Sequence, residues 1–188
     1  ALADTLKDRL FARLTLPKET VYVQESTEVI LSVYSHNLSL SDDFRLGNLP
    51  SSGLSFQSFR DLQTTRENVN GRVYTVRRFH AQVRGLTAGT FAIGPTLTVP
   101  VQVERNDRRR RSNSLFDSMF RGMMVQTRPV EIVPDPATIT ILPLPSADRP
   151  SDFSGAVGEF QFAVTAQPLE LDVGDPITLT MEVTGRGN

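Results

Sequence analysis

The chain contains no cysteine and no tryptophan. Without cysteine, disulfides, thiolate nucleophiles and cysteine-bound metal sites are excluded together. Apolar runs are also short, because none approaches the roughly 20 residues that a membrane-spanning helix needs, and no hydrophobic signal-peptide core precedes Ala1. We therefore expect this stretch of chain to be soluble by itself, with any signal sequence or membrane anchor lying outside it.

Lysine is scarce. It occurs only at Lys7 and Lys18, and every other positive charge is an arginine. The formal net charge of -1 gives no overall attraction to nucleic acid or to an acidic membrane, so any basic contact has to be local. The candidate for such a contact is the run Arg108, Arg109, Arg110 and Arg111. No aromatic platform is interleaved with this run, which favours a solvated loop.

The sequence offers little for catalysis. The two histidines, His36 and His80, fall in different expected elements, and His80 lies on the expected outer face of a strand, which favours a solvated or locally bonded side chain. No HExxH spacing completes a zinc site. Ser154 lacks the preceding glycine of a G-x-S-x-G elbow, and Gly155 with Gly158 lacks the Lys-Ser/Thr of a phosphate loop. We predict no catalytic, cofactor-binding or metal-binding residue, and no enzyme.

Alternating apolar residues predict strands along most of the chain. The expected strands cover residues 12–16, 21–23, 28–34, 54–59, 72–83 and 91–103. Asn70-Gly71 predicts a hairpin turn, because a type I′ turn needs positive φ at both central residues. The inward-facing set changes phase across Arg77-Arg78, which predicts a bulge. Short strands without helical periodicity predict an all-β fold, an immunoglobulin-like antiparallel β-sandwich.

An internal repeat divides the chain. Shifted by 150 residues, Leu14 falls on Val164, Leu31 on Met181 and Glu25 on Asp175, with the inward phase kept. This predicts an immunoglobulin-like domain over 1–142, a Pro/Gly joint over 143–158, and the first strands of a second, truncated domain over 159–188. So short a fragment closes no core alone. We therefore expect it to pack against the first domain, to pair with another chain, or to be poorly ordered. Pairing with another chain includes self-association through this truncated domain.

Residues 105–126 break the strand pattern and predict a short helical insertion. One helical face would carry Phe116, Met119, Phe120, Met123 and Met124. Ser114 with Asp117 resembles a capping box. Such a helix would cover the open end of its own sandwich, dock a partner protein through its Met- and Phe-rich face, or lie on a membrane surface.

The stretch RPSDFSGAVGEFQF, residues 149–162, predicts the joint between the domains. Pro150 stiffens its approach, and Gly155 and Gly158 provide the backbone freedom to turn. Phe153 and Phe160 would be its anchors, and we expect both rings to be buried against the domain interface.

Residues 142–188 resemble the BatD, or oxygen-tolerance, family of bacterial envelope proteins. The resemblance is carried by an LPLP link, a P-x-x-F-x-GAVG-x-F joint and a terminal G-x-GN; here these are Leu142–Pro145, Pro150–Phe160 and Gly185–Asn188. Gly85–Pro95 and an F-D-x-x-F element at Phe116–Phe120 match more loosely. The resemblance implies tandem immunoglobulin-like domains facing the periplasm and a C-terminal membrane anchor. It also implies work with von Willebrand factor A-type Bat proteins and a MoxR-type ATPase, without enzymatic activity.

The expected function is therefore non-enzymatic binding of other envelope proteins, with no nucleic acid partner. A partner with a metal-dependent adhesion site needs an acidic ligand, which the loop acids Asp42, Asp43 or Asp148 could supply. The alternative is a carbohydrate- or peptide-binding sandwich module, and a hydrolase is a third, weaker class. An aromatic-lined groove with polar groups would favour the ligand binder, and an exposed apolar edge or helix the scaffold.

Overall fold

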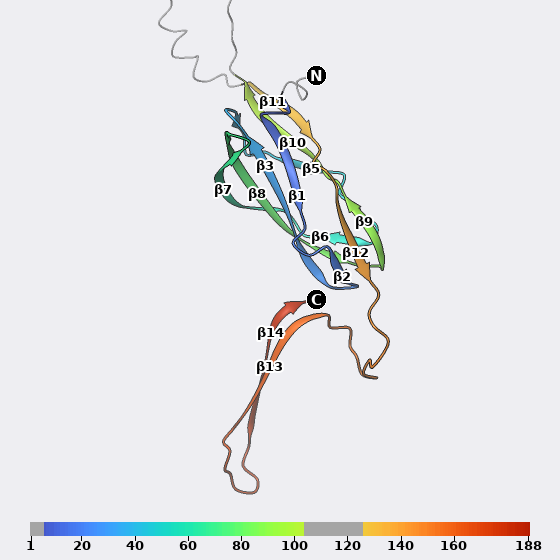
Figure 1. Ribbon diagram of the computed structural model, residues 1–188. Coiled ribbons are helices and arrows are strands. Elements are labelled where there is room, and N and C mark those ends of the chain that lie inside the picture. The colour runs from blue at the N-terminus through green and yellow to red at the C-terminus, as the bar shows by residue number, and fades with distance from the viewer. Residues whose placement is uncertain (1–5, 104–125) are drawn as a thin grey trace, which may run out of the picture.

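The computed structural model describes residues 6–103 and 126–188, and its regular elements are β-strands. Figure 1 shows the strands up to residue 142 gathered in one body, with β13 and β14 extending from it as a separate hairpin. The predicted all-β antiparallel sandwich is confirmed. The expected helical insertion over 105–126 lies outside the described residues, except for residue 126. The same holds for its aromatic and methionine face and for the run Arg108–Arg111.

One layer of the sandwich is a five-stranded antiparallel sheet. Its strands are β1 (Leu10–Thr15), β3 (Ser26–Ser35), β8 (Arg72–Gly85), β6 (Leu54–Phe56) and β7 (Arg60–Val69). β1, β3 and β8 are consecutive neighbours, and both β6 and β7 pair with β8. β3 and β8 are therefore the central strands of this layer.

The facing layer consists of two smaller sheets. The first contains β4 (Ser39–Leu40), β5 (Arg45–Gly47), β10 (Thr96–Val103) and β11 (Gln126–Ile132). The second contains β2 (Thr20–Tyr22), β9 (Gly89–Ile93) and β12 (Ala137–Leu142), with β2 and β12 parallel. The single strand expected over 91–103 is thus two strands, because the chain passes from one sheet to the other at Gly94-Pro95.

Each small sheet packs against its own part of the large sheet. One core cluster joins Val29, Ala81 and Val83 of the large sheet to Val21, Ile93, Ile139 and Ile141. The other joins Leu10, Leu31 and Val33 to Leu97, Val99, Val101 and Val130. The alternating apolar residues of β3 therefore contribute to both clusters, as period-two alternation requires.

The bulge predicted at Arg77-Arg78 is wrong. The ladder between β3 and β8 runs through these residues without a register shift. Phe79, Ala81 and Val83 belong to the two core clusters inside the sandwich. Tyr74 and Val76 instead cluster with Tyr34 on the outer face of the sheet. The phase of the pattern changes because the outer face of the sheet is apolar at this end. The register irregularity lies instead in β7, between Asp61 and Gln63.

Arg77 fills the inner position at which the apolar pattern is interrupted. Its guanidinium lies 4.7 Å from the ring centre of Phe44 and 5.5 Å from that of Phe79. It donates hydrogen bonds to the carboxylates of Asp61 and Asp42. Burial acts to lower the pKa of Arg77, but the two carboxylates outweigh it and the pKa is raised. A charged side chain thus closes this end of the core.

The predicted β7–β8 hairpin is confirmed. Asn70 and Gly71 have φ of 52° and 80°, as a type I′ turn requires. The carboxamide oxygen of Asn68 accepts a hydrogen bond of 2.9 Å from the amide of Gly71. The turn brings Val69 opposite Arg72 at the tip.

β13 (Gly158–Gln167) and β14 (Thr178–Gly187) form an antiparallel pair whose register repeats that of β1 and β3. Leu14 faces Leu31 in the first pair, and Val164 faces Met181 in the second. Every partner in the β1–β3 ladder reappears in β13–β14 at a residue number higher by 150. The strand pairing therefore repeats with the spacing of the sequence pattern.

The turn that precedes β3 is repeated before β14. The amide of Glu25 donates to the carbonyl of Tyr22, and its carboxylate accepts from the amide of Tyr22. Asp175 makes the same two bonds with Asp172. The residue before each acid has positive φ, 70° at Gln24 and 104° at Gly174. An acid closes the same turn in both copies.

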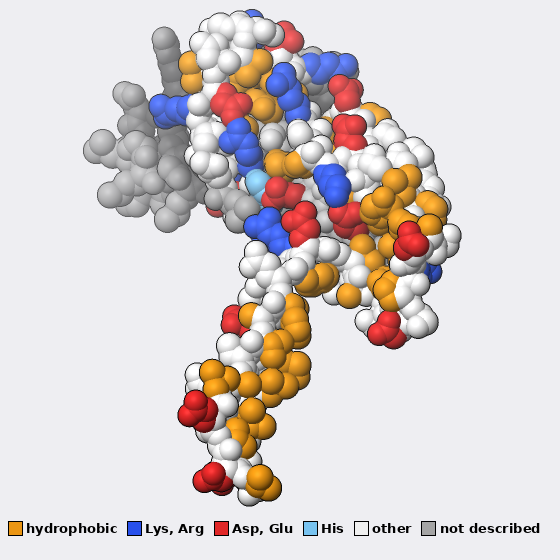
Figure 2. Space-filling model, turned by 60° about the horizontal axis from the view of Figure 1, so that its bottom comes forward, with side chains coloured by type: hydrophobic (Ala, Val, Ile, Leu, Met, Phe, Trp, Pro, Cys, Tyr) orange, Lys and Arg blue, Asp and Glu red, His pale blue; other side chains and the backbone are white. Residues whose placement is uncertain are grey.

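The apolar face of the hairpin is uncovered. It carries Phe160, Phe162, Val164, Leu179, Met181 and Val183, all of them exposed. Figure 2 shows them as a row of hydrophobic side chains along one side of the projecting hairpin. Of the three alternatives expected for this segment, packing against the first domain is not seen, because its apolar side chains are exposed.

The acid-closed turn makes stability depend on pH. Burial acts to raise the pKa of Glu25, but hydrogen bonds from the Lys18 ammonium and the Tyr22 amide lower it below its ordinary value of 4.5. Glu25 therefore stabilises the fold above its unfolded-state pKa, and this contribution is lost as the pH falls through the folded-state value. In urea unfolding, Glu25→Gln should lose about 1 kcal/mol near pH 7, a difference that shrinks toward pH 3. Glu19→Gln is the exposed control, and a pH-independent difference would contradict the assignment.

Candidate functional sites

The linker between the sandwich and the hairpin is organised by Arg149. Its guanidinium donates to the carbonyls of Leu144 and Pro145 and lies 5.6 Å from the ring centre of Phe153. These contacts are all within the linker. Arg149 therefore folds the proline-rich segment onto itself and holds the ring of Phe153.

Asn188 fastens the end of β14 to the start of β13. Its carboxamide donates to the carbonyl of Gly155 at 3.0 Å and accepts from the amide of Val157 at 2.7 Å. Its own amide donates to the carbonyl of Val157 at 3.3 Å. The two ends of the hairpin, more than thirty residues apart, are thus joined at one asparagine.

Glycine is required where the two strands meet. Gly158 has φ of 155°, and a Cβ there would lie 2.2 Å from the carbonyl oxygen of Arg186. The ring of Phe160 lies over Gly185 and Gly187, where added Cβ atoms would approach it to 2.9 Å and 2.3 Å. The spacing of these glycines therefore makes room for one aromatic ring.

The predicted burial of both joint aromatics is wrong. Phe153 is 38% exposed and Phe160 is 44% exposed. Each ring contacts a local partner instead, the Arg149 guanidinium for Phe153 and the β14 glycines for Phe160. The role of Pro150, Phe153, Gly155, Gly158 and Phe160 as an interdomain joint stays a prediction.

Both histidines are bonded locally. His80 lies 2.6 Å from the carboxylate of Glu28 on the outer face of the sheet, as its strand position predicted. A ring nitrogen of His36 lies 2.8 Å from the carbonyl of Val73. Within residues 6–103 and 126–188, no cluster of three His, Asp or Glu side chains is placed to hold a metal ion.

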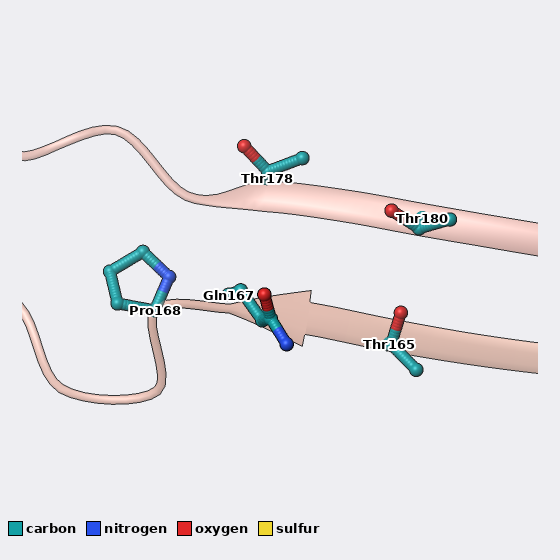
Figure 3. Close-up of a pocket in the computed structure, with 5 residues that line it drawn as sticks. All are labelled: Thr165, Gln167, Pro168, Thr178 and Thr180. Carbon is teal, nitrogen blue, oxygen red and sulfur yellow. The ribbon is translucent and has the colours of Figure 1, made fainter.

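A polar cavity of about 550 Å³ lies at the far end of the hairpin, where β13 meets Pro168. Thr165 faces Thr180 across the strands, and Gln167 faces Thr178 (Figure 3). None of these side chains titrates, and no aromatic ring lines the cavity. It offers hydrogen bonds, but none of its lining residues is an acid or a base that could activate a threonine hydroxyl.

The sequence pattern did not reveal an aromatic cluster on the outer face of the large sheet. The rings of Phe11 and Tyr34 stack with centres 4.6 Å apart, and Tyr74 meets Phe11 edge-on at 5.3 Å. The Arg13 guanidinium lies 5.4 Å and 5.1 Å from the ring centres of Phe11 and Tyr34. These side chains come from three strands, so only tertiary pairing brings them together.

Beside this cluster lies a depression of about 370 Å³, which we call the basic depression. It is lined by Lys7, Asp8, Phe11, Arg13, Val69, Asn70, Arg72 and Tyr74. The hydroxyl of Tyr74 donates to the carbonyl of Asp8 at 2.7 Å, which holds the N-terminal segment at its edge. An aromatic-lined groove with polar groups is thus present on the first domain.

The three loop acids differ in their partners. Asp42 pairs with Arg77 at 2.7 Å and Asp43 with Arg45 at 3.1 Å. Asp148 has φ of 56° and is exposed in the linker. Its carboxylate has no ion pair with any described residue. Of the three acids, Asp148 could therefore bind a partner without breaking such an ion pair.

No helix in the described parts of the chain is long and apolar enough to cross a bilayer. Comparison with protein-family models and with curated proteins found no match to this chain.

The junction at Asn188 gives a test of the hairpin. Replacing Asn188 with Ala removes both carboxamide bonds, and a net hydrogen bond contributes about 1 kcal/mol. We expect the Val157 amide to exchange its hydrogen roughly fivefold faster, as measured by NMR. Arg186→Ala, at an exposed side chain in the same strand, is the control. An unchanged Val157 exchange rate would show that the carboxamide does not hold the junction.

Proposed function

We propose that this chain is a non-enzymatic scaffold component of a bacterial envelope complex related to oxygen tolerance or stress, working with von Willebrand factor A-type Bat proteins and a MoxR-type ATPase. The resemblance of residues 142–188 to the BatD family supports this proposal. The motif residues of that resemblance lie together: Asn188 bonds to Gly155 and Val157, and Phe160 covers Gly185 and Gly187. The spacing of these motif residues is therefore explained by their contacts at the base of one hairpin.

The observation that carries the proposal is the structural repeat. β13–β14 has the register of β1–β3 and the same acid-closed turn. In the first domain, Leu31 and Val33 of this strand pair are buried by β10 and β11. The equivalent side chains, Met181 and Val183, are exposed. We infer that β13 and β14 open a second sandwich, which makes the protein a tandem array of binding domains.

The proposed location is the periplasmic side of the inner membrane, with attachment through a C-terminal membrane anchor. This follows from the family resemblance alone. The second candidate function, a carbohydrate- or peptide-binding module, is favoured by the basic depression, in which Phe11 and Tyr74 lie among charged side chains.

Affinity capture of the full-length protein from envelope extract tests the proposal. We expect von Willebrand factor A-type Bat proteins to be enriched over an unrelated envelope bait. A parallel capture without residues 105–124 tests the predicted docking segment, because equal recovery would remove that segment from the interface. If no Bat-type protein is enriched, the proposed complex is wrong.

A further prediction concerns Asp148. If its carboxylate completes a metal-dependent adhesion site on the partner, Asp148→Asn should weaken Bat-protein retention about tenfold or more, and a chelator should have the same effect on the wild type. Asp152→Asn, at an exposed side chain in the same linker, should retain the partner. Equal retention by both variants would exclude Asp148 as the ligand.

A further inference from the structure

We propose that the basic depression binds an acidic peptide segment of a partner protein, one that carries an aromatic or aliphatic side chain beside its carboxylates. The inference deepens the proposed function, on which it rests, by assigning the docking surface and the chemistry of its occupant. The depression joins the N-terminal segment and β1 to the tip of the β7–β8 hairpin.

The floor of the depression is prepared for an apolar side chain. Tyr74 is almost fully buried, Phe11 and Val69 are half-buried, and each lines the depression. Phe11 is fixed by stacking on Tyr34 and by edge-on contact with Tyr74. Fixed rings lose little conformational entropy on binding, which is why aromatic residues serve as anchors in protein interfaces.

The rim carries more positive than negative charge. Three of the lining side chains are cationic, those of Lys7, Arg13 and Arg72, and one is a carboxylate, that of Asp8. Arg13 lies over aromatic rings, and neither it nor Arg72 forms an ion pair with a carboxylate of the described residues. Arg78 on the same face is different, since Glu67 accepts its hydrogen bond. Exposed guanidinium groups beside an apolar floor match a carboxylate next to an apolar side chain.

This arrangement favours a peptide over a neutral sugar. A sugar would stack on a ring face, but Phe11 already stacks on Tyr34 and both rings lie close to the Arg13 guanidinium. It would also leave the guanidinium groups of Arg13 and Arg72 without a carboxylate partner among the described residues. A peptide with alternating acidic and apolar residues satisfies the rim and the floor together.

The test uses a fluorescein-labelled hexapeptide of alternating Glu and Phe with the protein of residues 1–188. We expect saturable binding by fluorescence anisotropy and NMR shifts confined to the amides of residues 7–13 and 69–74. Peptides with Gln in place of Glu, or Ser in place of Phe, should bind about tenfold more weakly or worse. Equal binding of the Gln peptide would overturn the role of the rim charges.

Arg72→Glu provides the variant test, because the Arg72 side chain is exposed at the hairpin tip and its replacement leaves the aromatic cluster in place. Binding should fall about tenfold or more. Arg66→Glu is the matched control, with the same change of charge on the same hairpin. Arg66 faces Thr75, on the opposite side of the sheet from Arg72 and Tyr74. Equal losses in the two variants would mean that net charge alone drives binding, and the proposal would be wrong.

The two levels of proposal can fail separately. If the full-length protein retains Bat-type proteins and Arg72→Glu retains them equally, the depression is not the docking surface, although the envelope function stands. If the peptide binds the wild type, and not Arg72→Glu, while no Bat-type protein is enriched, the binding site stands and the proposed complex is wrong.

Discussion

The antiparallel ladder between β3 and β8 is the interaction on which the rest of the structure depends. Its inner face contributes Val29, Ala81 and Val83 to one core cluster and Leu31 and Val33 to the other, so both small sheets pack against the same two strands. Its outer face holds Tyr34 and Tyr74, which position Phe11. Because side chains alternate strictly between the faces of a strand, this one register places both the core and the basic depression.

The hairpin has the same local construction without the same surroundings. Its register and turn repeat those of the first strand pair, and Asn188 and Phe160 hold its base. A two-stranded sheet is marginally stable in water, and stability increases when its apolar face is covered. The local bonds therefore define the shape of the hairpin, whereas its uncovered face is where further strands would add most of the free energy.

Much of the fold could be predicted from the sequence, since alternation, Asn70-Gly71 and the internal repeat are local patterns. The error at Arg77-Arg78 arose because an apolar cluster on the outer face resembles a change of phase in one strand. The basic depression could not be predicted, because Lys7 and Arg72 meet only through the pairing of β1, β3 and β8. Phe153 and Phe160 were misassigned because hydrophobicity does not distinguish a ring that contacts a nearby guanidinium or glycines from one that fills an interface.

The uncovered hairpin also has a consequence for the solution behaviour of the chain. Both outer edges of β13 and β14 lack a neighbouring strand among the described residues, and the face between those edges is apolar. Open edges with alternating apolar side chains are templates for strands of other molecules. For residues 1–188, association of molecules through the hairpin, rather than unfolding of the sandwich, would then set the highest concentration at which the protein stays monodisperse.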